Sequence, residues 1–430
     1  MTSPGYSSIA RNEDRPKESK PIQVEFIPYR KDQSLCPVHI ISPSDAPYMH
    51  TFFDVQPFSP CQRYLLFTRL PYQYKSPRFG DTADVCILDL QNRTLKTIYS
   101  TKAWGSQLGA NVQWGDDSRY VYTNDWIGLQ YVCIRIDLET GEIHAFAGPM
   151  YHISPDASFA AGFPPDYINF TQVGYGAPEN PEAMPDPYSG APGGLGLFQT
   201  NLKTNTSKLI MELSRFKPYY DEEKFTDGTY YLFHTKYNAH SDRIMQVVRC
   251  MVPGSKAWNP SLYTFDLNGN DLQQAINVDQ WGKGGNHPNW HPDGRRIVMN
   301  LRAGGESGSE KMKMVIFNDD GSNMNVLSKH NGSGHPSVTR DTHYLLTDAY
   351  ALEREKEFIN KDGEVKIRLI DLRSDEEEAI CYVYVPPVSV YGSQRIDPHP
   401  VWGRDFKKVI FAGAPQGKRE IFLADLSDTI

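Results

Sequence analysis

Three histidines in the C-terminal half of the chain open the same short phrase. His287, His335 and His399 are each followed directly by proline, and six residues after each histidine stands an aspartate that belongs to a turn. Neutral imidazole is a common metal ligand and a common general base. Residues at one position of a closed repeat reach the same level of the fold, so we predict that these side chains converge. The alternative is that each histidine bonds locally to a neighbouring loop.

A carboxylate and an amide lie close to the last of these histidines. Asp397 and His399 are two residues apart, and residues at that spacing in an extended strand lie on one face. With Gln394, the set offers nitrogen and oxygen donors without a thiolate. Such a set suits Mn²⁺, or alternatively Zn²⁺, Fe²⁺ or Ca²⁺, better than copper(I) or an iron–sulfur cluster.

The repeat that contains the histidines recurs along nearly the whole chain. Each copy has a turn followed by a short apolar strand, and a partner strand follows later and ends at turn residues. The seven turn-plus-strand segments are 59–67, 115–122, 154–159, 226–233, 291–298, 339–346 and 403–410. The partner strands are 85–90, 131–138, 197–202, 262–267, 314–317, 367–372 and 421–426.

Seven copies predict an all-β fold, a seven-bladed β-propeller formed by residues 1–430 as a single domain. One blade cannot bury its apolar face alone, and a ring of blades solves this while leaving only short edges. The last copy ends near the C-terminus, so we expect an N-terminal strand at 22–27 to complete the last blade. Irregular segments at about 172–195 and 249–260 are predicted to be loop insertions.

Composition limits the partners of the protein. A formal net charge of -8 argues against a nucleic-acid surface, which needs a basic stripe to neutralise phosphates. No run of about 18 apolar residues is present, and the N-terminus lacks the apolar core of a signal peptide. We therefore expect no nucleic-acid or membrane partner and a cytoplasmic location, while the oligomeric state is left open.

The C-terminal half resembles the oligogalacturonate lyases, seven-bladed propellers that cleave short pectic uronides by β-elimination with a bound divalent metal, typically manganese. The family ends in a Gln-x-x-His-Pro-His-Pro phrase, which Gln394 and His399 match. The resemblance implies that these two residues and His335 bind metal. It also implies that His287, which precedes a Pro-Asp-Gly turn, is the catalytic base, and that Arg243 matches a functional arginine.

Asp397 departs from the family phrase, which has a histidine there. The implied metal ligands of this chain are therefore His335, Gln394, Asp397 and His399. A carboxylate can still bind a hard divalent ion, but it adds a negative charge that weakens the attraction for a substrate carboxylate and can change the metal preference. The departure leaves the identity of the sugar open.

The resemblance implies a carbon–oxygen lyase that acts on an acidic oligosaccharide and leaves a 4,5-unsaturated uronate. In this hypothesis the metal and Arg243 neutralise the uronate carboxylate, and His287 takes the C5 proton. His234 and His240 lie close to Arg243 in the sequence and are further candidates for substrate binding.

Two other functions stay open from the sequence. A non-enzymatic scaffold or binding propeller is compatible with the fold, because the Pro-Asp-Gly blade signature is shared with propellers of the translocation type. A metal-dependent glycoside hydrolase or epimerase could use the same residues. The three histidines at one repeat position favour an enzyme over a scaffold.

Overall fold

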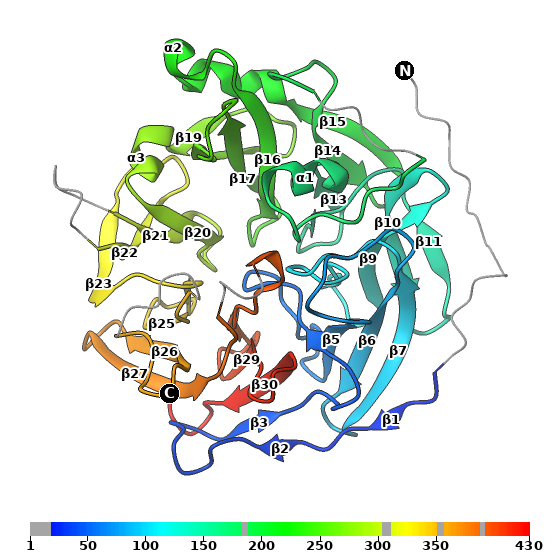
Figure 1. Ribbon diagram of the computed structural model, residues 1–430, viewed down its shortest axis with the longest axis vertical. Coiled ribbons are helices and arrows are strands. Elements are labelled where there is room, and N and C mark those ends of the chain that lie inside the picture. Colours follow the sequence, from blue (N-terminus) through cyan, green and yellow to red (C-terminus); the bar gives the residue numbers. More distant parts are fainter. Residues whose placement is uncertain (1–18, 183–187, 303–310, 351–356, 388–391) are drawn as a thin grey trace.

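Seven β-sheets surround a central axis in the computed structural model (Figure 1). The structure describes residues 19–182, 188–302, 311–350, 357–387 and 392–430. In each blade the strand nearest the axis is followed outward by its antiparallel neighbours. The protein is therefore a seven-bladed β-propeller, and the fold class predicted from the repeats is confirmed.

Blades 1 to 4 follow one another along the chain, each with four strands in sequence order. Blade 1 also carries a short outer strand, β1 (Ile22–Gln23), on β7. The strands are β4 (Tyr48–Met49), β5 (Tyr64–Arg69), β6 (Ala83–Asp89) and β7 (Thr94–Thr101); β8 (Gln113–Trp114), β9 (Tyr120–Ile127), β10 (Gln130–Asp137) and β11 (Ile143–Ala145); β12 (His152–Ile153), β13 (Phe159–Gly162), β14 (Gly196–Asn201) and β15 (Thr206–Glu212); and β16 (Thr229–Tyr237), β17 (Arg243–Met251), β18 (Pro260–Asp266) and β19 (Gln273–Ile276).

Blades 5 and 6 repeat this plan, and blade 7 takes strands from both ends of the chain. Their strands are β20 (Gly285–Trp290), β21 (Arg296–Leu301), β22 (Lys313–Asn318) and β23 (Asn325–Asn331); β24 (Ser337–Val338), β25 (Tyr344–Thr347), β26 (Val365–Asp371) and β27 (Glu376–Val383); and β28 (Val401–Trp402), β29 (Lys408–Gly413), β30 (Glu420–Asp425), β3 (Val38–Ile40) and β2 (Ile27–Pro28).

The ring closes through β3, which pairs with β30, while β2 lies outside β3. The segment expected for this role, 22–27, does not supply the closing strand. Its first residues form β1, which pairs with β7 of blade 1. Burial explains the difference: Val38 and Ile40 turn their side chains into the apolar interior, whereas Ile22 and Ile27 are exposed.

Blade 4 departs from the sequence repeat. In the other six blades the predicted turn leads into the second strand, whereas the turn before 229 leads into β16, the innermost strand. The turn that corresponds to the others is 238–242, where Asn238 Oδ1 accepts the backbone N–H groups of Asp242 and Arg243. This turn lacks the Pro-Asp-Gly signature, so the repeat was aligned one strand too early in this blade.

The loop insertions lie in blades 3 and 4. Residues 172–195 connect α1 (Pro165–Thr171) to β14, with 183–187 outside the described residues, and residues 252–259 connect β17 to β18. The other helices are η1 (Leu213–Tyr219), α2 (Glu222–Phe225), α3 (Val278–Gly282) and η2 (Gly392–Gln394). Among the described residues, no helix has the length and apolar character needed to cross a membrane.

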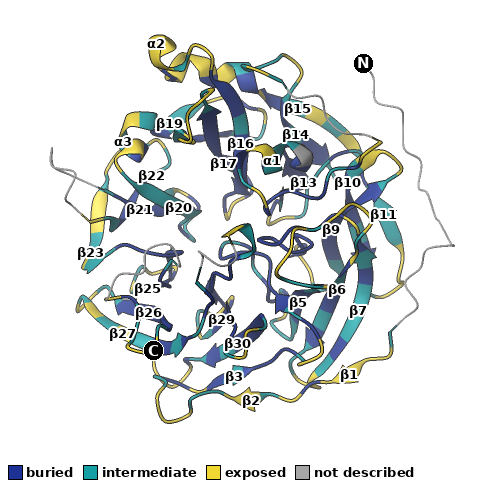
Figure 2. Ribbon diagram, in the orientation of Figure 1, coloured by how far each residue is buried: buried dark blue, intermediate teal, exposed yellow. Residues whose placement is uncertain are grey.

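Burial is greatest on the strands that approach the axis and lower on the outer strands and connections (Figure 2). Two large apolar clusters hold the ring, one centred on blades 3 to 5 and one that joins blades 6, 7 and 1. The β-branched and aromatic residues of the strands fill these clusters. This packing fixes the innermost strands, which carry the candidate site.

Candidate active site

The structure brings the three phrase histidines together near the axis. His287 lies on β20, His335 two residues before β24 and His399 two residues before β28. The ring centroids of His287 and His335 are 4.0 Å apart, and those of His335 and His399 are 4.3 Å apart. Residues separated by more than a hundred positions thus form one cluster, because each enters the innermost strand of its blade.

An unusual backbone conformation aims several of these side chains. His287 and His399 have φ angles of 53° and 49°, in the left-handed region that few non-glycine residues adopt. His234 has a φ of 57° and lies where the pairing of β16 with β17 shifts by one residue. A shift of the same kind surrounds His287 on β20. Such bulges re-aim a side chain, and here they accompany the histidines of two innermost strands.

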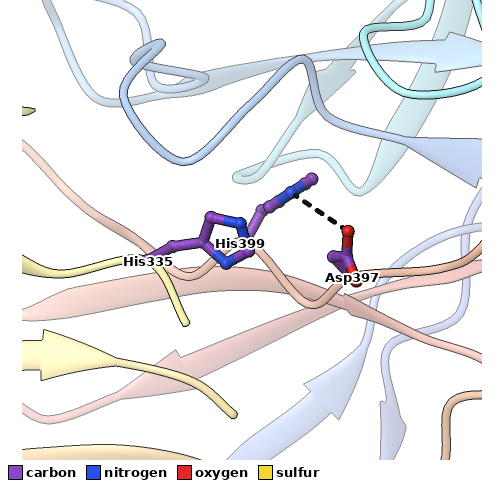
Figure 3. A group of neighbouring side chains, drawn as sticks. All are labelled: His335, Asp397 and His399. Atoms are coloured by element: carbon purple, nitrogen blue, oxygen red, sulfur yellow. Dashed lines mark ion pairs between the residues drawn. The ribbon is translucent and has the colours of Figure 1, made fainter. Parts of the chain in front are cut away.

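His335, Asp397 and His399 form a candidate metal centre (Figure 3). One ligand atom from each lies within 4.8 Å of the others, and all three residues are buried. His399 Nε2 and Asp397 Oδ1 have no hydrogen-bond partner among the described residues. Leaving buried polar atoms without partners costs free energy. Asp397 Oδ2 lies 3.9 Å from His399 Nε2, and a divalent cation at the triad would give the buried Nε2 a partner. Two imidazoles with a carboxylate are a donor set that such ions accept.

Asp348 holds two of these histidines in place, a role that no sequence motif indicated. Its Oδ1 accepts the backbone N–H of His335 at 2.8 Å and lies 2.9 Å from His335 Nδ1, while Oδ2 accepts the backbone N–H of His399 at 3.1 Å. A carboxylate that binds one ring nitrogen fixes the tautomer and leaves the other, His335 Nε2, for an ion. A side chain at Gly334, which has a φ of 66°, would collide with Asp348.

Burial sets the charges of this pair. It raises the pKa of Asp348 to about 6 and lowers the pKa of His335 to about 3. At neutral pH the carboxylate is therefore ionised and the imidazole is neutral, which is the state that can bind a cation.

Replacement of Asp348 by asparagine should destabilise the protein and weaken its metal site. An amide sets an NH₂ group against N–H donors, so at least one buried donor loses its acceptor, at a cost of about 1–3 kcal/mol. Urea unfolding should show a lower midpoint, and Mn²⁺ titration a weaker affinity. Asp362→Asn, at an exposed position of the same blade, is the control. Equal behaviour of the two variants would contradict the positioning role.

His287 lies beside the candidate metal triad and is not one of its three residues. Its Nδ1 lies 2.6 Å from the carbonyl oxygen of Gly334, so Nδ1 carries the proton and Nε2 presents a lone pair. Burial and the neighbouring His335 hold the pKa of His287 well below its ordinary value. The imidazole is therefore neutral and half-buried beside the triad.

Two phenylalanines from the connection after β4 form an apolar wall against the cluster. The Phe52 ring is 4.5 Å from His399 and 5.2 Å from His234 between centroids, and the Phe53 ring is 5.0 Å from His335. Both are almost fully buried. They exclude water and strengthen electrostatic interactions at the site. The sequence repeat gave no signal for them, because they lie between repeat elements.

His234 lies at this site, as a member of the same ring cluster. Its Nδ1 pairs with the Tyr151 hydroxyl, and its ring stacks on Phe52. Burial, with smaller contributions from Lys236 and Arg249, holds its pKa well below the ordinary value. A role of His234 in substrate binding stays a prediction.

Arg243 and His240 lie elsewhere, and the prediction that they join the histidine site is wrong. His240 lies in the β16–β17 turn and Arg243 follows it directly. This turn contacts the β20–β21 turn, where His240 Nε2 lies 2.7 Å from the Asp293 carbonyl oxygen. The Arg243 guanidinium pairs with Asp271 at 2.7 Å and Asp319 at 2.5 Å. Both residues therefore have their hydrogen-bond and ion-pair partners at the end of blade 4 that carries the 238–242 turn, away from the histidine cluster. The error comes from the family resemblance, in which Arg243 was matched to the functional arginine.

Arg249 lies at the other end of β17 and packs on Phe233, whose ring contacts that of His234. Its guanidinium carbon lies 3.7 Å from the centroid of the Phe233 ring and 4.4 Å from that of Trp258, and Nη2 donates to Gln172 at 2.8 Å. Nε and Nη1 are buried with no partner among the described residues. Burial lowers its pKa to about 9, so it stays a cation at neutral pH. Unpaired guanidinium N–H groups suit a carboxylate.

A signal for Arg249 existed in the sequence but was not used. The residue opens the insertion 249–260, and its partners Gln172 and Trp258 belong to the two predicted insertions. The inserted loops therefore build the surroundings of this arginine.

Gln394 ends the short helix η2 and is half-buried. Its amide nitrogen donates to the hydroxyl groups of Ser76 at 3.1 Å and Ser393 at 2.5 Å. Among the described residues these serines, rather than the triad, are its hydrogen-bond partners. Its place as a fourth metal ligand stays a prediction.

Neither a family model nor a curated protein sequence matches the chain. Solved structures do match: an oligogalacturonate lyase from Vibrio parahaemolyticus aligns with a TM-score of 0.64 and 14% identity, over 96% of this chain and 99% of its own. The chain has the fold of an oligogalacturonate lyase. An oligogalacturonate lyase in complex with manganese aligns over the same shares, with a TM-score of 0.64 and 15% identity. TolB from Acinetobacter baumannii aligns over 74% of the chain with a TM-score of 0.39.

Proposed function

We propose that this protein is a carbon–oxygen lyase that cleaves a uronic-acid-containing oligosaccharide by metal-assisted β-elimination. The observation that carries the proposal is a neutral histidine, His287, beside the candidate metal triad. Its ring centroid lies 4.0 Å from that of His335, and His399 Nε2 and Asp397 Oδ1 of the triad have no hydrogen-bond partner among the described residues. A proton acceptor beside a candidate cation centre is what removal of a proton next to a carboxylate requires. The manganese complex of a lyase with this fold supports the choice of Mn²⁺.

In the proposed reaction, the metal ligands and Arg249 stabilise the negative charge of the substrate carboxylate. The C5 proton of a uronate is poorly acidic, because its removal builds negative charge beside a carboxylate. A divalent cation held by His335, Asp397 and His399, with Gln394 as the fourth ligand, would supply electrostatic neutralisation of that carboxylate when bound. Arg249, in place of Arg243, offers its unpaired Nε and Nη1 N–H groups to a carboxylate oxygen.

His287 is the proposed general base. Its Nε2 accepts the C5 proton, the C5–H electrons form the C4–C5 double bond, and the C4–O bond breaks. The departing oxygen takes a proton from solvent, and His287 returns its own proton to solvent. Its Nδ1–H bond to the Gly334 carbonyl holds the ring in the tautomer that this step needs.

The proposal is tested by incubating the purified protein with a panel of uronic-acid oligosaccharides, with Mn²⁺ and with EDTA. The absorbance of the conjugated double bond should rise with at least one substrate, and EDTA should abolish the rise. If the protein binds Mn²⁺ and no substrate gives absorbance, the lyase assignment fails and a hydrolase or binding propeller takes its place.

The reassignment of the arginine gives a separate prediction. Arg249→Met should lower kcat/KM about 10- to 100-fold, because a charge-assisted hydrogen bond contributes about 1.5–3 kcal/mol. Arg243→Met is the matched comparison: it removes ion pairs at the turn and should lower the melting temperature without a comparable loss of kcat/KM. A larger loss of kcat/KM for Arg243→Met would restore the original assignment.

A further inference from the structure

Arg395 is bound to the carboxylate of the candidate metal triad. Its Nε lies 2.8 Å from Asp397 Oδ2, and both side chains are nearly inaccessible to solvent. The other oxygen, Oδ1, is the one without a partner. Asp397 Oδ2 also lies 3.9 Å from His399 Nε2, so the guanidinium binds the same carboxylate oxygen that approaches the triad.

The position of Arg395 is fixed from several sides. Its Nη2 donates to the Tyr175 hydroxyl at 2.9 Å, and its guanidinium carbon lies 5.5 Å from the centroid of the Tyr350 ring. Its backbone carbonyl accepts from Gln107 Nε2 and Arg419 Nη2, each at 3.0 Å. The guanidinium therefore has little freedom to leave the carboxylate.

The charges at the triad balance only if Arg395 is counted. Metal-binding imidazoles are neutral, so His335 and His399 contribute no charge and Asp397 contributes one negative charge. Arg395 cancels it, and the full charge of a divalent cation then stays available for an anionic sugar. The nearby buried groups Arg419 and Asp348 add one charge of each sign and leave this balance unchanged.

We propose that Arg395 is a specificity-determining residue: by neutralising Asp397 it lets a carboxylate-containing metal centre accept a uronate. The inference rests on the proposed function, since it presumes a metal at the triad and an anionic sugar as the ligand. Without the guanidinium, the triad would hold a cation more tightly and attract the uronate less.

The test measures metal and sugar binding by calorimetry, without turnover. Mn²⁺ is titrated into wild type, Arg395→Gln and Arg395→Lys, and galacturonate or glucuronate is then titrated into each Mn²⁺-loaded protein, with galactose as the uncharged control. Glutamine keeps an N–H donor for Asp397 but removes the charge, whereas lysine keeps the charge. Arg395→Gln should bind Mn²⁺ about tenfold more tightly and the uronate about tenfold more weakly, as expected when one nearby unit charge is removed.

Arg395→Lys should keep both affinities near those of wild type. A general loss of structure would weaken both, so opposite shifts identify the charge effect. The double variant Arg395→Gln with Asp397→Asn removes both charges and should recover part of the uronate affinity; it also serves if the single variant does not fold.

The outcomes separate this inference from the proposed function. If wild type binds Mn²⁺ and the uronate but Arg395→Gln shifts both affinities in one direction or neither, the role of Arg395 is overturned alone. If wild type binds no Mn²⁺, the metal-assisted function and this inference both fail.

Discussion

Replacement of His287 by alanine is expected to lower kcat about 100- to 10,000-fold, the range that a general base contributes. The metal content should stay as in wild type, because His287 lies outside the triad of His335, Asp397 and His399. Stability should change little as well. The Gly334 carbonyl that His287 contacts also accepts Asn300 Nδ2 at 2.8 Å and would not be left unsatisfied.

The measurement combines steady-state kinetics with metal analysis of the same preparation. His343→Ala is the matched control, a histidine of blade 6 whose exposed ring pairs with Asp341. Activity in His287→Ala close to that of the control would remove the proposed base. A simultaneous loss of metal would show instead that His287 is a ligand.

Loss of metal is the expected result of replacing either histidine of the triad. His335→Ala and His399→Ala each remove one imidazole from a centre that has three described ligand groups, and should be purified with little Mn²⁺ and almost no activity. His335→Ala should also destabilise the fold, because Asp348 loses the Nδ1–H partner that it meets at 2.9 Å. His399→Ala keeps the backbone N–H that Asp348 accepts, so its stability should fall less.

Metal analysis after desalting, together with melting curves with and without added Mn²⁺, distinguishes these effects. Wild type and the His343→Ala control should melt at a higher temperature when Mn²⁺ is added, because an ion that binds only the folded state stabilises it. The two triad variants should show no such rise. Metal retained at wild-type stoichiometry in both variants would place the ion elsewhere.

Most of the fold, and the convergence of the three histidines, could be predicted from the repeat pattern. A histidine that opens the same phrase in three blades must enter three innermost strands, and closure of the ring then brings His287, His335 and His399 together. The partner strands were also recognisable, because each is apolar and ends at turn residues. Local pattern and ring geometry were sufficient for these features.

The remaining features depend on contacts that no local pattern encodes. Asp348 acts through backbone N–H groups of two different blades, and the positive φ angles of His234 and His287 accompany bulges in β16 and β20. Arg249 was missed because the family resemblance was matched at Arg243, although Arg249 opens the predicted insertion 249–260. Closure by 38–40 instead of 22–27 was decided by burial against blade 7.

The most direct test of the central claim is the mass of the products formed from a defined uronic-acid oligosaccharide in the presence of Mn²⁺. Elimination adds no water, so the masses of the two fragments should sum to the mass of the substrate. The fragment from the reducing-end side of the cleaved bond should carry the double bond, in its new non-reducing-end residue. Fragments whose masses sum to the substrate plus one water would contradict the account and identify a hydrolase.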